Sequence, residues 1–414
     1  MRPPEHELIY DWNTAGNPPR PQQAIEFDDE TLRDGLQGPS VVSPPIEDKI
    51  RLLHLMDQLG LHTADIGLPG AGPHVVAHVK RLAQEIASAK LRITANCAAR
   101  THEADIRPVA EIQQEVGIPI EVCTFLGSSF IRMYAEDWSV DRLLRMTEEA
   151  VSFAVKQGLT VMYVTEDTTR AHPDHVKALY QAAIRAGARR LCVADTVGHA
   201  TPEGAANLVR FVRQAAHEVD PTVKIDWHGH QDRGLGVINT IAAALAGADR
   251  LHGCAIGIGE RVGNTPMDQL LVNLRLMGWI DNDLSALGEY CELTSRACGV
   301  AIPVNYPVMG RDAFRTGTGV HAAAIIKAFR KKDEWLVDRV YSGVPSSWVG
   351  REQEIEVGPM SGESNVVFWL QRRGIEPRPE LVKTIFEAAK KSDRLLTEAE
   401  IQALIGRASE RAAV

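Results

Sequence analysis

The chain has 414 residues, of which 44% are hydrophobic and 24% are charged, as in an ordinary soluble globular protein. This length is too great for one simple core, but it suffices for a large catalytic domain with a smaller appendage. The formal net charge of −9 and the isoelectric point near 5.9 argue against nucleic acid or an anionic membrane as the main partner.

No stretch of the chain is apolar for long enough to span a bilayer, and the opening residues lack the apolar core of a signal peptide. The six cysteines are scattered, and no two of them form a C-x-x-C pair. A cysteine inside an apolar run behaves as a small hydrophobic residue, so no disulfide framework is expected. We therefore predict a cytoplasmic protein without membrane contact.

The N-terminal residues 1–21 are rich in proline and show no periodicity, so we expect an extended arm there. From Ala24 onward, short apolar runs alternate with longer amphipathic segments. Eight of the runs are predicted strands: residues 24–27, 62–68, 91–97, 118–125, 160–165, 190–195, 223–228 and 250–257.

Helices are predicted between the strands, and two of them carry clear start signals. Residues 43–60 begin with Ser43 as the N-cap and Pro44 at the first helical position, and they end at Gly60. Residues 201–216 open with a threonine and a proline in the same way.

The alternation of eight strands with helices over about 270 residues fits a (β/α)₈ TIM barrel, whose usual size is about 250 residues. A doubly wound open sheet is the alternative. Polar clusters stand directly after several strands, and only in a barrel do all strand ends converge on one face. We therefore predict an α/β chain with a TIM-barrel catalytic domain over residues 22–282.

The pattern changes after Asn282. Helical patterns cover residues 287–300, 321–341 and 379–408. The segment 351–360 indicates a short strand or loop. We predict a smaller, mainly helical C-terminal region over residues 283–414, and we expect no separate regulatory domain.

Two histidines and an aspartate predict a metal site. The sequence WHGH places His228 and His230 two residues apart at the end of the seventh strand, so both side chains face one side. Asp34 follows the first strand, a near neighbour of the seventh in a closed barrel. One carboxylate and two imidazoles leave positions open for substrate and water. Mg²⁺, Mn²⁺ and Zn²⁺ all suit these ligands, and Arg33 would face the substrate.

A glycine-rich loop, GIGERVGN, continues the eighth strand at the same predicted face. Gly257 and Gly259 allow the backbone to approach a ligand closely, and Glu260 and Arg261 add charge of both signs. Such a loop is by itself a weak signal for phosphate binding. Its position places it at the barrel end where the metal is expected.

Six motifs occur in the order found in one family: DETLRDGLQ, TEDTTR, ADTVG, HGHQDRGLGVIN, GIGERVGNTP and GTGVH. Over residues 24–362 the chain resembles the metal-dependent barrel acyltransferases and lyases, and it is most similar to the isopropylmalate, homocitrate and citramalate synthases. The resemblance implies an acyltransferase of amino-acid biosynthesis that condenses acetyl-CoA with a 2-oxoacid, with one divalent metal ion as cofactor. It also implies a homodimer in which the C-terminal region contacts the partner's barrel.

The resemblance assigns roles to individual residues. The metal ligands would be Asp34, His228, His230 and Asn264. The catalytic groups would be Arg33, Glu166, His321 and Tyr341. Substrate would contact Thr196, Arg132, Arg100, Asp65, Arg170 and Gln37, and acetyl-CoA would contact Gly257, Gly259, Glu260 and Arg261. Arg33 would stabilise negative charge on the ketone oxygen, and Thr196 would bind the 2-oxoacid carboxylate.

The sequence departs from the family pattern at positions that bear on the substrate. Asp65 stands where the family often has glutamate, and Arg132 where isopropylmalate synthases commonly have histidine. We hypothesise that Arg100, Arg132 and Arg233 recognise a second anionic group, because a planar guanidinium suits carboxylate or phosphonate oxygens. The alternative is that these arginines are surface residues.

Several of these residues also have structural alternatives. Glu166 and Arg170 could form an ion pair at a strand end. His321 could cap a helix, and Tyr341 could be a core aromatic with its hydroxyl at the surface. His252, on the eighth strand, is expected to be a satisfied core histidine.

Two other functions are possible. A carbon–carbon lyase such as hydroxymethylglutaryl-CoA lyase shares the DGLQ motif, but it would carry a cysteine-bearing glycine loop where this chain has GERVGN. A non-catalytic barrel that binds a ligand is the second alternative. The joint presence of the expected metal ligands and Arg33 argues against it.

Overall fold

The computed structural model describes residues 2–412, with side chains up to residue 408. The chain divides into two compact units. The barrel unit comprises the residues up to Asn282 together with Leu293–Val300. The C-terminal unit comprises Asp283–Glu292 together with the residues from Ala301 onward.

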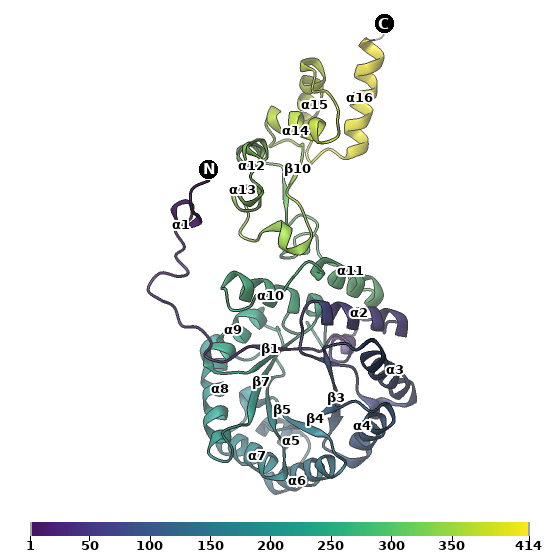
Figure 1. The fold of residues 1–414 in the computed structure, drawn as a ribbon, viewed down its shortest axis with the longest axis vertical. Coiled ribbons are helices and arrows are strands. Elements are labelled where there is room, and N and C mark those ends of the chain that lie inside the picture. Colours follow the sequence, from purple (N-terminus) through teal and green to yellow (C-terminus); the bar gives the residue numbers. More distant parts are fainter. Residues whose placement is uncertain (1, 413–414) are drawn as a thin grey trace. The chain divides into compact units, whose positions relative to one another are not determined.

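The barrel unit is built on a closed ring of parallel strands in the order β1 to β8. The ring closes where β1 pairs with β8, with Phe27 opposite Leu251. Figure 1 shows the strands around a common centre with helices outside them. The strands are β1 (Glu26–Asp29), β2 (Thr63–Asp65), β3 (Thr94–Arg100), β4 (Ile120–Gly127), β5 (Thr160–Glu166), β6 (Arg190–Asp195), β7 (Lys224–Gly229) and β8 (Arg250–Gly253). The predicted TIM barrel is confirmed.

Helices connect the strands and cover the outside of the ring. They are α2 (Ile46–Gln58), α3 (Pro73–Ala89), α4 (Glu103–Val116), α5 (Phe130–Ala135), α6 (Val140–Lys156), α7 (Pro173–Ala186), α8 (Pro202–His217), α9 (Gly236–Ala246) and α10 (Met267–Leu276). Short 3-10 turns follow the strand ends at η1 (Gly35–Gln37), η2 (Pro69–Ala71), η3 (Thr168–Arg170) and η4 (Ala255–Gly257). Helix α8 starts as predicted, because the Thr201 hydroxyl accepts a hydrogen bond from Gly204 N.

Several local predictions differ from the structure; strand β3, for example, begins and ends three residues later than predicted. Helix α2 begins at Ile46, so Ser43 is not its N-cap and Pro44 is not its first residue. The residue before a proline avoids the helical conformation, and Pro44 precedes Pro45. Strand β1 starts two residues later than predicted and includes two buried aspartates. The N-terminal arm contains a four-residue helix, α1 (Glu5–Leu8).

The lumen of the barrel is divided by polarity. The inward-facing residues from β7, β8 and β1, together with the residue after β1, form the charged half of the lumen: Glu26, Asp28, Glu30, Asp226, His228, Arg250 and His252. The inward-facing residues from β3 to β6 at cavity level form the apolar half: Ala98, Cys123, Phe125, Met162, Val164, Cys192 and Ala194.

The charged half is closed at its base by an ion-pair network. Arg250 is only 2% exposed, and its guanidinium lies 2.7 Å from Asp226 and 2.5 Å from Glu121. Arg190 pairs with Asp226 at 2.7 Å and with Glu26 at 2.5 Å. A buried charge is costly unless it is paired, and each guanidinium here has at least two carboxylate partners.

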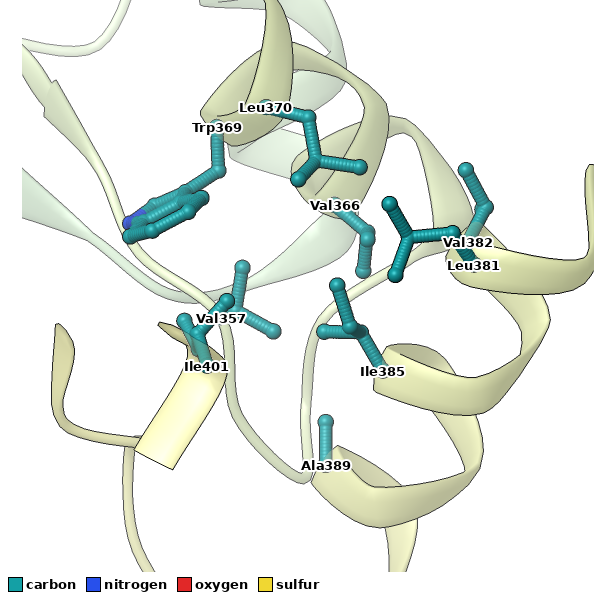
Figure 2. Close-up of a cluster of buried hydrophobic side chains, with 9 residues drawn as sticks. All are labelled: Val357, Val366, Trp369, Leu370, Leu381, Val382, Ile385, Ala389 and Ile401. Atoms are coloured by element: carbon teal, nitrogen blue, oxygen red, sulfur yellow. The ribbon is translucent and has the colours of Figure 1, made fainter. Parts of the chain in front are cut away.

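The C-terminal unit is mainly helical, as predicted. Its elements include β9 (Arg315–Thr316), α12 (Gly319–Lys331), α13 (Glu334–Arg339), η5 (Ser346–Val349), β10 (Glu354–Ile355), α14 (Glu363–Arg372), α15 (Pro379–Lys391) and α16 (Glu398–Ala412). Helix α11 (Leu287–Cys298) crosses the division between the units. Figure 2 shows the core that α14, α15 and α16 share: Val357, Val366, Trp369, Leu370, Leu381, Val382, Ile385, Ala389 and Ile401.

All six cysteines are buried and free. Burial raises the pKa of the Cys123 and Cys192 thiols well above the ordinary value, so both are neutral. None of the helices between residues 2 and 412 combines the length and the apolarity that a membrane span needs.

Candidate metal and substrate site

A cavity of about 280 Å³ lies among the carboxyl ends of the barrel strands, the face where TIM barrels form their sites. Its wall contains the whole apolar half of the lumen together with part of the charged half. The predicted site residues that line it are Arg33, Asp34, Gln37, Glu166, Thr196, His228, His230 and Glu260.

Asp34, His228 and His230 converge on one point. Oδ2 of Asp34 lies 3.9 Å from Nε2 of His228 and 4.0 Å from Nε2 of His230. Two atoms bound to one ion at about 2.0–2.2 Å each lie at most about 4.4 Å apart. The three buried side chains therefore have the spacing that one divalent ion requires. Strands β7, β8 and β1 are neighbours in the ring, which brings these distant parts of the sequence together.

Glu30 orients His228, a role that the sequence prediction does not include. One carboxylate oxygen lies 2.8 Å from Nδ1 of His228, so Nε2 is the atom that faces Asp34. Burial alone would raise the pKa of Glu30, but His228 and Arg33 outweigh burial and hold it well below the ordinary value. A carboxylate behind a metal-ligating histidine fixes its tautomer and ring orientation. Glu30 stands in the charged DETLRD cluster directly after β1, so the sequence contained a signal for it.

A second set, Glu30, His228 and His252, also has the spacing of a metal site. Both ring nitrogens of His252 are already engaged, Nδ1 by Glu30 at 2.8 Å and Nε2 by Asp226 at 3.0 Å. Burial opposes protonation of His252, but Asp28, Asp226 and Glu30 outweigh it and raise the pKa to about 10. A protonated imidazole does not bind a metal. His252 is thus the satisfied core histidine that the sequence predicts, and the first set is the better metal site.

Asn264 adjoins the first set of ligands. Its Nδ2 donates to Oδ1 of Asp34 at 2.8 Å. Its Oδ1 is buried and has no hydrogen-bond partner in the described part of the chain. A buried oxygen without a partner is costly, and a cation would satisfy it. Gly259 permits this close packing, because a Cβ atom there would lie 2.2 Å from Nδ2 of Asn264. The residues present therefore fit a divalent ion with oxygen and nitrogen ligands.

Arg33 lies between three carboxylates. Its guanidinium is 2.6 Å from Asp65, 2.9 Å from Asp34 and 3.2 Å from Glu30. Asp65 is absent from the described cavity lining, so it acts on the site through Arg33. Burial raises the pKa of Asp65 to about 7, although Arg33 opposes this shift.

Glu166, Thr196 and Gln37 line the cavity from the ends of β5, β6 and η1. The hydroxyl of Thr196 accepts a hydrogen bond from Asp167 N at 2.8 Å, which fixes its position. Burial raises the pKa of Glu166 above the ordinary value, and the positive charge of Arg132 partly offsets the shift. A raised pKa suits a carboxylate that exchanges protons near neutral pH.

The loop after β8 needs its glycines. Gly257 and Gly263 have φ angles of +67° and +97°, and a Cβ atom at Gly263 would lie 1.8 Å from the carbonyl oxygen of Gly257. The two charged residues of the loop differ in their surroundings. Glu260 lines the cavity, whereas Arg261 binds the carboxylate of Asp232 at 2.8 Å.

Two predicted substrate-binding arginines lie outside the described cavity lining. Arg100 forms a two-bond ion pair with Asp105, at 2.7 and 2.9 Å. Arg170 forms a similar pair with Asp167, with both bonds at 2.7 Å. Arg170 therefore binds Asp167 rather than Glu166, the partner considered from the sequence.

Arg132 and Arg233 are also absent from the described lining. Arg132 pairs with Glu136 at 3.0 Å, and its guanidinium lies 5.7 Å from the ring centroid of Trp138. Arg233 donates to the backbone oxygen of His199 at 2.9 Å and is exposed. The positive charge of Arg132 still acts on Glu166 in the cavity wall, where it lowers the pKa of that carboxyl.

His321 and Tyr341 belong to the C-terminal unit. Their rings stack with centroids 4.2 Å apart, and both side chains are exposed. Thr318, not His321, occupies the N-cap position of α12, and Tyr341 is 48% exposed. The structural alternatives, a helix cap and a core aromatic, therefore do not describe these two residues.

The sequence from residue 24 to residue 293 matches a family model described as HMGL-like. The match covers more than half of the chain. The chain belongs to the HMGL-like family. The matched region spans the whole barrel of this HMGL-like protein and the first part of α11.

Curated relatives cover most of this HMGL-like chain. The homocitrate synthase AksA of Methanopyrus kandleri is 30% identical over 373 residues, which are 89% of this chain and 88% of that protein. The 2-isopropylmalate synthase of Pyrococcus furiosus is 30% identical over 390 residues, which are 92% of this chain and 75% of that protein. The predicted resemblance to these synthases is confirmed.

A solved structure shares the fold of this HMGL-like barrel. The HMG-CoA lyase of Bacillus subtilis superposes with a TM-score of 0.57 and 22% sequence identity, covering 69% of this chain and 97% of that chain. At this identity the likeness shows the fold alone. It does not favour the lyase over the synthase.

Proposed function

We propose that this chain is an acyltransferase that condenses acetyl-CoA with a 2-oxoacid and hydrolyses the thioester to release CoA. The observation that carries the proposal is the convergence of Asp34, His228 and His230 in one cavity with Arg33 and Glu166. Relatives named as synthases, at 30% identity over most of the chain, support the same reaction class.

Asp34, His228, His230 and Asn264 would hold a divalent metal ion. The unpartnered Oδ1 of Asn264 and the contact of Glu30 with His228 support this ligand set. The donors suit Mg²⁺, Mn²⁺ and Zn²⁺. When bound, the ion polarises the ketone oxygen of the 2-oxoacid as a Lewis acid.

The chain's own residues supply the proton transfers and the charge stabilisation. Arg33 donates hydrogen bonds to the ketone oxygen as negative charge develops on it, and Thr196 holds the 2-oxoacid carboxylate. Glu166 accepts a proton from the methyl group of acetyl-CoA. A bond forms between that methyl carbon and the ketone carbon, and the ketone oxygen takes up a proton. Water then cleaves the thioester, which yields a carboxylate and the free thiol of CoA.

The proposal also assigns roles to the glycine loop and to two residues of the C-terminal unit. The backbone from Gly257 to Gly259, with Glu260 and Arg261, contacts acetyl-CoA. His321 and Tyr341 act as further acid–base groups, and their exposed, stacked rings are accessible for such a role. Alanine at either position should lower the turnover number more than it changes the affinity for the 2-oxoacid.

The proposal includes a homodimer, a cytoplasmic location and a role in amino-acid biosynthesis. Free, buried cysteines suit a reducing compartment. Size-exclusion chromatography with light scattering should give twice the chain mass of 45.4 kDa. A mass of one chain at micromolar concentration would contradict the dimer.

Thiol release tests the proposed reaction. The purified full chain is incubated with acetyl-CoA, single 2-oxoacids and Mg²⁺, Mn²⁺ or Zn²⁺, and free thiol is measured. We expect release that requires both the acid and the metal, stops on chelation and returns when metal is added back. Asp34→Asn serves as the inactive control. Cleavage of a hydroxyacyl-CoA without thiol release would support the lyase instead, and no release with any 2-oxoacid would contradict the proposal.

A further inference from the structure

The apolar half of the lumen supplies none of the groups that the proposed reaction uses. Its residues come from four adjacent strands, and Cys123, Met162 and Cys192 pack with Val164 in one cluster. The two thiols are neutral, because burial raises their pKa well above the ordinary value. Leu68, after β2, extends the same apolar wall. This wall offers dispersion contacts to a ligand but no ion pair.

The charged side chains that line the cavity are mainly carboxylates: Glu30, Asp34, Glu166 and Glu260. Apart from the metal-ligating histidines, the lining cations are Arg33 and His252. Arg33 already pairs with three carboxylates, and His252 is held between Glu30 and Asp226. Among the lining residues that the structure describes, no cation remains for a second carboxylate on the substrate. Burial of an unpaired carboxylate is strongly unfavourable.

The arginines that could have recognised a second anionic group have other partners. Arg100 binds Asp105, Arg132 binds Glu136, and Arg233 binds a backbone oxygen. Arg100 and Arg233 would have to give up these bonds to reach a ligand in the cavity. Arg132, whose charge already acts on Glu166 in the cavity wall, would have to leave a half-exposed ion pair.

We infer that the 2-oxoacid carries a short, uncharged, apolar side chain that packs on the wall formed by Leu68, Ala98 and Phe125. This inference rests on the proposed function. It replaces the hypothesis of a second anionic group. Ala98 would leave space for this side chain, because its methyl group is among the smallest side chains on the wall.

The first test compares two acids of equal carbon number that differ in one terminal carboxylate. The kcat/KM for thiol release is measured for 2-oxopentanoate and 2-oxoglutarate with the metal-loaded full chain. We expect a preference of at least about 100-fold for 2-oxopentanoate, the range that a hydrophobic pocket supplies. Equal use, or a preference for 2-oxoglutarate, would overturn the inference while leaving the proposed function intact. No release with either acid, or with pyruvate, would refute the proposed function and this inference with it.

Two variants test whether the apolar wall causes the preference for 2-oxopentanoate. Ala98→Leu should lower kcat/KM for 2-oxopentanoate about 10-fold or more relative to pyruvate, because the added carbons occupy the side-chain space. Leu68→Arg, at the less buried end of the wall, should shift the ratio of the two five-carbon acids towards 2-oxoglutarate by at least about 10-fold. If the kcat/KM ratios of the compared acids were unchanged in both folded variants, the substrate side chain would not lie against this wall. Arg132→Ala tests the competing hypothesis: a selective loss of 2-oxoglutarate use would overturn the inference, and an equal effect on both acids would support it.

Discussion

The charged half and the apolar half of the barrel lumen line one cavity, but different interactions stabilise them. In the charged half, Arg250 and Asp226 are buried as ions and depend on their partners being present. In the apolar half, Cys123 and Val164 pack in one cluster with Met162, whose sulfur also accepts a hydrogen bond from Arg250 at 3.1 Å. Removal of one member of an ion-pair network leaves a buried charge, whereas a packed wall accepts side chains of similar volume. The charged half should therefore tolerate substitution far less.

The same difference separates the two tasks of the site. Metal binding needs Asp34 and the two histidines to be held at fixed positions. Glu30 of the charged half contacts His228, and Arg33 contacts Asp34. Substrate discrimination needs a shape without charge, which the apolar half provides. A change in one half should affect one task and spare the other.

The largest effect is expected from Asp34→Asn. An amide is a poorer metal ligand than a carboxylate, so the variant should lose its bound ion and at least about 10³-fold in kcat/KM, which is about 4 kcal/mol of barrier. Metal content by mass spectrometry and thiol release measure both losses. Cys123→Ala, in the apolar half, is the matched control and should keep the metal. Full metal content in Asp34→Asn would contradict the ligand set.

The next largest effect concerns stability. Arg250→Met removes a buried cation that Asp226 and Glu121 share, and it leaves Asp226 with Arg190 and His252 as partners. The loss should lower the free energy of unfolding by about 3 kcal/mol. Met162→Leu keeps a similar volume in the apolar half and removes only the weak hydrogen bond that the sulfur accepts from Arg250, so it should cost less than about 1.5 kcal/mol. Urea unfolding of the two variants provides the comparison. An equal loss in the free energy of unfolding for the two variants would contradict the claim that the charged half tolerates substitution less than the apolar half.

Glu30→Gln should weaken the site without unfolding the barrel. The amide no longer fixes His228 as a carboxylate does, so metal affinity should fall about 10- to 100-fold. Isothermal titration with Mn²⁺ measures the loss. Glu121→Gln, at the base of the charged half, should change stability more than metal affinity. If Glu121→Gln weakened the metal as much as Glu30→Gln, the role of Glu30 would not be specific.

The smallest effect is a shift in the pH profile. Glu166 must be ionised to accept a proton, so activity should fall as the pH drops through its pKa, which burial raises above the ordinary value. Arg132 lowers this pKa and Glu260 raises it. The acidic limb of kcat/KM should therefore move to higher pH in Arg132→Ala and to lower pH in Glu260→Gln. Arg33 and Asp167 also act on Glu166 and are unchanged in both variants. Shifts in the same direction would rule out Glu166 as the titrating base.

Much of this architecture could be predicted from the sequence, because the periodicity of apolar runs identifies strands without knowledge of their partners. Strand β6 has the predicted bounds, and the order of all eight strands is as expected. The cluster of Asp34, His228 and His230 could be predicted because the two histidines lie at the end of β7 and Asp34 lies five residues after β1. The ion pairs of Arg100 and Arg170 were not predicted, although an aspartate stands five and three residues away, respectively, a local signal for ion pairing.

The charged half of the lumen was not predictable. Arg250 and His252 look like polar interruptions of a strand until the barrel register shows that both face inward. Their partners are remote: Arg250 and Glu121 are separated by 129 positions in the chain. Single-strand patterns carry no information on such pairs. The apolar half could not be predicted for the same reason, because its residues come from four strands that become neighbours only in the folded barrel.

The position of a bound metal tests the central claim most directly. Crystals of the full chain grown with Mn²⁺ should show one anomalous peak in the cavity, at bonding distance from Asp34, from Nε2 of His228 and from Nε2 of His230. A peak among Glu30, His228 and His252 instead, or no peak at these residues in protein that retains Mn²⁺, would contradict the account.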